Sequence, residues 1–129
     1  MIQRIQSFYL FLVVLCSALQ WYWSCSSTLS HDASLQLLLH KGFLVSGGLA
    51  LLSLFLFKKR KQQQILNRIN LLLEVITLGF FVFFYFILGG TEGWEYYLVL
   101  SLINIFLLLL ANRGIKKDEE LIRSVDRIR

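Results

Sequence analysis

Residues 69–88, INLLLEVITLGFFVFFYFIL, decide the fold of this chain, because Glu74 is the one charged residue in an otherwise mostly apolar stretch. An α-helix rises about 1.5 Å per residue, so this stretch reaches about 30 Å, the thickness of the hydrocarbon core of a bilayer. The chain of 129 residues has three further apolar stretches, at 5–23, 35–57 and 94–111. The sequence therefore predicts one domain, residues 1–129, folded as an all-α four-helix transmembrane bundle.

The basic residues are expected on one side of the membrane. Twelve of the thirteen lie before the first stretch, between the second and third, or after the fourth, and Lys41 is the exception. The twelve are Arg4, Lys58, Lys59, Arg60, Lys61, Arg68, Arg113, Lys116, Lys117, Arg123, Arg127 and Arg129. Lysine and arginine are enriched at the cytoplasmic ends of membrane helices. We therefore expect an even number of crossings, with both termini in the cytoplasm.

The second stretch is the weakest of the four, because Lys41 lies inside it. The uncharged part, residues 42–57, reaches only about 24 Å, so Lys41 is expected to extend its ammonium group outward to the interface. Small residues recur every four positions at Gly42, Ser46 and Ala50. This spacing places them on one helical face and favours close approach of a neighbouring helix.

A short cytoplasmic amphipathic helix is expected at the C-terminus, over residues 117–129. Residues 112–114 (Asn-Arg-Gly) are expected to end the fourth span before it. One face of this tail is apolar and carries Leu121, Ile122, Val125 and Ile128. Such a helix would lie on the membrane surface or dock under the bundle.

Polar residues also recur within the third stretch and just before it. The predicted intramembrane polar stripe consists of Asn67, Asn70, Glu74 and Thr77, which share one helical face. Asn104 and Ser101 of the fourth stretch are candidates for hydrogen bonds to this stripe.

Glu74 allows two interpretations. Acidic groups inside membrane spans face the bundle interior, are paired and deserve a functional hypothesis. In the structural interpretation, Glu74 lies near the inner interface and pairs with Arg4, Arg68 or Arg113. In the functional interpretation, the carboxyl group lines a path for a solute or ion.

The sequence lacks the residue patterns of common catalytic and cofactor sites. Cys16 and Cys25 form no C-x-x-C motif, and no phosphate-binding loop, dinucleotide fingerprint or nucleophile elbow is present. His31, Asp32 and His40 are too few and too widely spaced to predict a zinc site. The net charge of +5 is explained by the basic flanks of the spans rather than by nucleic-acid binding. We therefore assign no catalytic residue, metal ligand or cofactor, and no nucleic-acid partner.

Three segments resemble a bacterial family of small integral membrane proteins, known as domain of unknown function family 4293. They are MIQRIQSFYLFLV (1–13), FKKRKQQQILNRINLLL (57–73) and LANRGIKKDEELIRSVDRIR (110–129). The resemblance runs nearly end to end, and its last motif is the most specific. It implies four membrane helices and a bacterial inner-membrane location, and it brings no activity, substrate or catalytic residue.

Two functions remain open. The first is a non-enzymatic scaffold or accessory subunit that docks lipid, a membrane protein partner or a second copy of itself at its cytoplasmic face. The second is a small transporter or channel component that uses Glu74. The expected cytoplasmic interface comprises Arg4, Lys58, Lys59, Arg60, Lys61, Arg68, Asn112, Arg113, Asp118, Glu119 and Glu120.

Overall fold

The computed structural model describes residues 2–26, 33–56, 58–89 and 94–128, with side chains described for 5–24, 41–56, 58–87, 95–125, 127 and 128. Every regular element within these ranges is an α-helix, which confirms the all-α prediction. The helices are α1 (Ile2–Ser26), α2 (Ala33–Phe55), α3 (Arg60–Leu88) and α4 (Trp94–Ile128).

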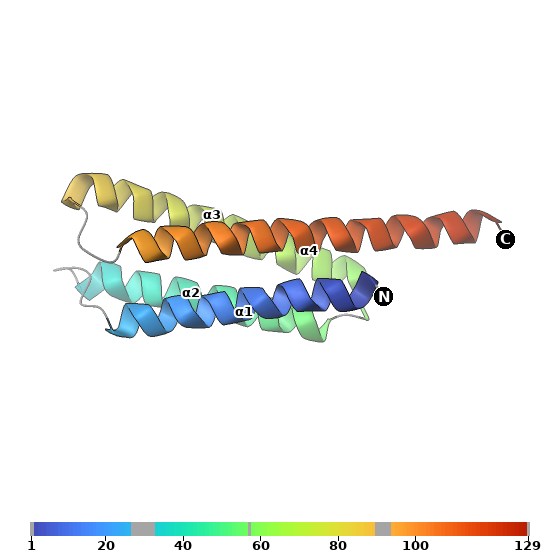
Figure 1. The fold of residues 1–129 in the computed structure, drawn as a ribbon, viewed down its shortest axis with the longest axis horizontal. Coiled ribbons are helices and arrows are strands. Elements are labelled where there is room, and N and C mark those ends of the chain that lie inside the picture. The colour runs from blue at the N-terminus through green and yellow to red at the C-terminus, as the bar shows by residue number, and fades with distance from the viewer. Residues whose placement is uncertain (1, 27–32, 57, 90–93, 129) are drawn as a thin grey trace.

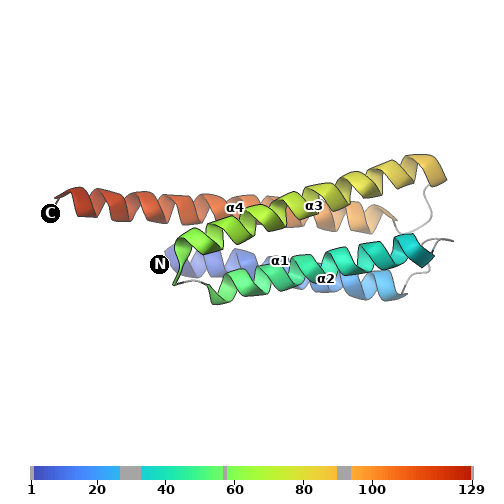
Figure 2. The ribbon, with the colours of Figure 1, turned by 180° about the vertical axis from the view of Figure 1, so that it is seen from behind.

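The four helices form an antiparallel ring. α1 packs against α2 and α4, and α3 packs against the same two helices. Figures 1 and 2 show four helices running along the same long axis, with the start of α1 and the end of α4 at the same end of the bundle. This arrangement is the one that an even number of crossings requires.

Within the described residues, three helical segments are long and apolar enough to cross a membrane: Ile5–Ser24, Arg60–Ile87 and Glu95–Val125. In α2 the apolar segment within the described side chains is Lys41–Phe55, which reaches only about 22 Å. Length and composition therefore support three of the four expected spans. α2 completes the ring as a helix of 23 residues.

The bundle is polar inside and apolar outside. Among the described residues, 13 polar or charged side chains and 10 hydrophobic ones are buried. Large apolar side chains are exposed on every helix, for example Phe11, Leu52, Ile76 and Phe106. Proteins in water bury such side chains and expose charged ones, so the reversed pattern suits a bundle surrounded by hydrocarbon.

Two apolar clusters lie at different heights along the bundle. One is a stack of Phe43, Phe81 and Tyr97, with ring centroids 5.3 to 5.9 Å apart. The other comprises Leu10, Val13, Ala50, Leu107, Leu108 and Ala111. Between the two clusters, the inward-facing positions on the four helices are polar.

The small residues of α2 face the interior, as their spacing predicted. Ser46 and Ala50 are at most 1% exposed. A Cβ atom added at Gly42 would lie 3.2 Å from Thr77 Cγ2 on α3, which is tighter than ordinary contact. The absence of a side chain at Gly42 thus allows α2 and α3 to approach closely.

One predicted helix boundary is wrong, and one helix is longer than its apolar stretch. α3 begins at Arg60, before the apolar stretch 69–88, because the glutamine-rich connection is itself helical. α4 continues without a break through residues 112–114, so 117–129 do not form a separate tail helix. A helical glycine costs only about 1 kcal/mol. The absence of a side chain at Gly114 also makes room for α1, since a Cβ atom there would lie 2.9 Å from Gln6 Cγ.

The close approach at Gly42 predicts a position-specific loss of stability. Gly42→Val should lower the free energy of unfolding by about 1 to 3 kcal/mol, because added methyl groups overpack the contact with Thr77. Gly48→Val is the matched control, since a Cβ at Gly48 meets nothing within 4 Å. Unfolding by sodium dodecyl sulfate in mixed micelles measures both. Equal losses for the two variants would contradict the packing of α2 against α3.

Candidate functional site

Glu74 lies at the centre of the bundle and is fully buried. Ser46 Oγ of α2 donates a hydrogen bond of 2.6 Å to Glu74 Oε1, and Asn104 Nδ2 of α4 donates one of 3.2 Å to the same oxygen. Both partners are neutral. The carboxyl group therefore joins three helices, and no described side chain of opposite charge lies at hydrogen-bond distance from it.

Asn104 extends this network to α1. Its Nδ2 lies 3.0 Å from Gln20 Oε1 and 3.4 Å from Ser17 Oγ. Gln20 Nε2 in turn donates a bond of 2.9 Å to Ser101 Oγ. All four helices thus contribute to a single set of buried polar side chains. We call it the polar centre; it comprises Ser17, Gln20, Ser46, Asn70, Glu74, Ser101 and Asn104.

The predicted polar stripe faces the interior of the bundle. Asn67, Asn70 and Glu74 are fully buried, and Thr77 is partly buried with its Oγ1 bonded to the Glu74 carbonyl oxygen. Asn70 Nδ2 donates a bond of 3.2 Å to the Ser46 carbonyl oxygen. Asn104 bonds to the stripe as expected, whereas Ser101 bonds to Gln20 instead.

The prediction that Glu74 pairs with Arg68 or Arg113 is wrong. Both arginines are exposed, and Glu74 makes neither pair. Arg68 lies six residues before Glu74 towards the start of α3, and Arg113 lies nine residues past Asn104 towards the end of α4, whereas Ser46 and Asn104 lie level with Glu74. The Arg4 side chain lies outside the described residues, so that alternative stays a prediction.

Three buried oxygen atoms in the polar centre have no hydrogen-bond partner in the described part of the chain. They are Asn70 Oδ1, Glu74 Oε2 and Asn104 Oδ1. All three can accept hydrogen bonds, so a donor or a cation beside each would satisfy it. No group of three histidine, cysteine or acidic residues suited to a metal occurs among the described residues. Cys25, His31, Asp32 and His40 fall outside the described side chains.

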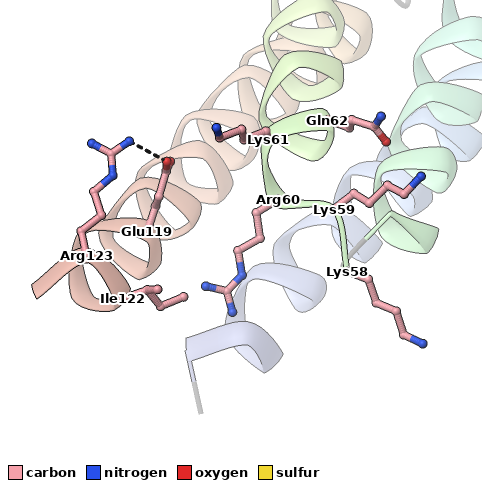
Figure 3. Close-up of a pocket in the computed structure, with 8 residues that line it drawn as sticks. All are labelled: Lys58, Lys59, Arg60, Lys61, Gln62, Glu119, Ile122 and Arg123. Atoms are coloured by element: carbon pink, nitrogen blue, oxygen red, sulfur yellow. Dashed lines mark hydrogen bonds and ion pairs between the residues drawn. The ribbon is translucent and has the colours of Figure 1, made fainter. Parts of the chain in front are cut away.

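A second candidate site lies where α3 begins beside α4 (Figure 3). Its volume is about 550 Å³. We call it the basic groove; it is lined by Lys58, Lys59, Arg60, Lys61, Gln62, Glu119, Ile122 and Arg123. Arg123 forms an ion pair with Glu119 one helical turn away, at 3.0 Å.

The groove unites only part of the expected cytoplasmic interface. It contains the four basic residues at the start of α3, together with Glu119. Arg68, Arg113 and Glu120 are exposed outside it, and Asp118 is buried. Asn112 is half-buried, with its Oδ1 unpartnered among the described residues. The participation of Arg123 and Ile122 was not foreseen, because the expected break in the fourth span had separated the tail from the bundle.

The hydrogen bond between Glu74 and Asn104 should be measurable as a coupling energy. In a double-mutant cycle of Glu74→Leu and Asn104→Leu, we expect a coupling of about 0.6 to 1.7 kcal/mol, as for other hydrogen bonds between membrane helices. A cycle of Glu74→Leu with Ser101→Ala is the control, because Ser101 bonds to Gln20 and not to Glu74. Unfolding in mixed micelles gives both values. If the coupling energy of Glu74 and Asn104 is no larger than that of the control cycle, the hydrogen bond between them in the polar centre is contradicted.

Comparison with known proteins identifies the family. The family model for Domain of unknown function (DUF4293) matches residues 32–128. The matched region contains the whole basic groove and every residue of the polar centre except Ser17 and Gln20 of α1, which lies before it. No curated protein and no solved structure matches the chain. Because the match covers more than half of the chain, the protein belongs to the family described as Domain of unknown function (DUF4293).

Proposed function

We propose that this protein is a non-enzymatic scaffold or accessory subunit of a bacterial inner membrane. It crosses the bilayer four times with both termini in the cytoplasm, and it docks lipid or a partner protein at its cytoplasmic face. The distribution of basic residues supports this orientation. The reversed polarity of the bundle supports its insertion in hydrocarbon.

The observation that carries the proposal is the part of α4 that extends past the rest of the bundle (Figure 1). Its apolar face, formed by Leu121, Ile122, Val125 and Ile128, is between 44% and 87% exposed. The basic groove lies at the base of this extension. An exposed apolar face next to clustered cations is suited to a membrane surface or an amphipathic partner.

Photo-crosslinking in cells tests the docking role. A crosslinker at Val125 should yield discrete adducts, separable by mass into protein and lipid adducts, because Val125 lies on the exposed apolar face. Arg127 is the matched control, since it is also exposed but lies about 200° around the helix from Val125. Yields at Val125 no higher than at Arg127, together with a lone monomer in mild detergent, would count against the proposal.

The second candidate function is a transporter or channel component. The burial of Glu74 among neutral partners favours it, as do the three unpartnered oxygens beside the network. Intramembrane carboxyl groups commonly mark ion or proton pathways. A bundle of four helices encloses little space, so transport by this protein would involve oligomers.

Flux measurements in proteoliposomes separate the two functions. If the protein conducts, Glu74→Gln should reduce cation flux by about tenfold or more, because loss of the charge removes a transition-state attraction of order 1.4 kcal/mol. Glu120→Gln removes the same charge at an exposed position and should leave the flux unchanged. Absence of sodium, potassium and proton flux in the wild type would exclude this candidate.

A further inference from the structure

We propose that the basic groove binds the phosphate group of an anionic lipid headgroup. The inference rests on the proposed function, because it names the ligand of the same cytoplasmic face. Four observations lead to it: the charge of the lining, an unpartnered guanidinium nitrogen, the uncapped start of α3, and an exposed apolar stripe that leads away from the groove.

The lining is strongly cationic. Five of its eight residues are basic, and Glu119 is its one acid. Both carboxylate oxygens of Glu119 are occupied, since Oε1 accepts from Arg123 at 3.0 Å and Oε2 accepts from Gln64 at 3.2 Å. Among the described residues the ion pair of Glu119 is with Arg123, not with Arg60 or Lys61, so the start of α3 keeps its positive charge.

Arg60 supplies the most direct indication of an anion. Its Nη1 atom is buried and has no hydrogen-bond partner among the described residues. Figure 3 shows its guanidinium extending from the start of α3 towards Ile122 of α4, within the groove. A guanidinium presents its N–H groups in a planar fork that matches the oxygens of a phosphate. A phosphate bound there would satisfy the buried donor.

The start of α3 adds donors of its own. The N-cap residue, Lys59, makes no side-chain capping bond, and the first turn contains no acidic residue. The first N–H groups of an α-helix lack acceptors within the helix and lie at the positive end of the helix dipole. Helix N-termini of this kind accommodate phosphate groups.

The surroundings of the groove fit a lipid better than a free phosphate ion. Lys61 begins a face of α3 that continues as exposed apolar side chains. These are Ile65, Ile69, Leu72 and Ile76, which are 47% to 60% exposed. A ligand with a phosphate head and acyl chains matches both parts, with the phosphate at Arg60 and Lys61 and the chains along α3.

Native mass spectrometry of the delipidated full chain in detergent tests this assignment. The probes are dioleoylphosphatidylglycerol, which is anionic, and dioleoylphosphatidylcholine, which has the same chains and no net charge. The wild type should prefer the anionic lipid. In the double variant Arg60→Gln, Lys61→Gln that preference should fall by roughly tenfold or more, since both residues would lose a direct charge-assisted hydrogen bond to the phosphate.

The matched control is Lys116→Gln, Lys117→Gln, which removes the same charge at exposed positions on α4 outside the groove. The preference of this control for the anionic lipid should stay within about twofold of that of the wild type. If the preference came from diffuse surface charge, the two double variants would lose it equally. Equal losses, or retained preference in the groove variant, would overturn the proposal. If the groove double variant fails to fold by circular dichroism, Lys61→Gln alone replaces it, with Lys116→Gln as its control.

Two further measurements distinguish a lipid phosphate from free inorganic phosphate, and lipid binding in the groove from docking at the end of α4. Millimolar inorganic phosphate should not displace the anionic lipid, and full displacement would overturn the assignment to lipid. Crosslinking from Val125 reports docking independently. Protein adducts there, without any lipid preference of the groove, would overturn this inference and leave the scaffold role standing.

Discussion

The fold depends on keeping one carboxyl group, that of Glu74, buried among four helices with neutral side chains as its partners in the described part of the chain. Burying a charged or polar group is costly unless it is hydrogen-bonded. Here Ser46 and Asn104 provide the bonds, and each must reach Glu74 Oε1 from a different helix. That requirement fixes the relative heights of α2, α3 and α4. Through Asn104 and Gln20 it also fixes the height of α1.

Apolar side chains fill the interior of the bundle on either side of Glu74 along its long axis. Towards the start of α1, small and aliphatic residues such as Ala50 and Leu108 fill the space between the helices. Towards the other end, the stacked rings of Phe43, Phe81 and Tyr97 fill it. Because hydrocarbon surrounds the proposed membrane bundle, apolar burial brings little association energy there, and packing with polar bonds must hold the helices together.

The two candidate sites share the same pair of helices. α3 carries both Arg60 and Glu74, about 21 Å apart along its axis, and α4 carries both Asn104 and Glu119, about 22 Å apart. The continuity of α4 is what brings Arg123 and Ile122 to the start of α3. A separate tail helix would have left the basic residues of α3 without this wall, and the groove would not exist.

Much of the architecture was predictable from the sequence alone, because hydrophobic length, charge and helical spacing are properties of local segments. They identified the apolar stretches, the basic side, the inward face of α3 and the small face of α2. The tertiary structure decided how the segments meet. It gave Glu74 a serine and an asparagine as partners in place of an arginine, since partner choice depends on the relative height of helices far apart in the chain. It also continued α4 through Gly114, which the local sequence marks as a break. There the glycine leaves room for Gln6 of α1, a contact that the local sequence does not reveal.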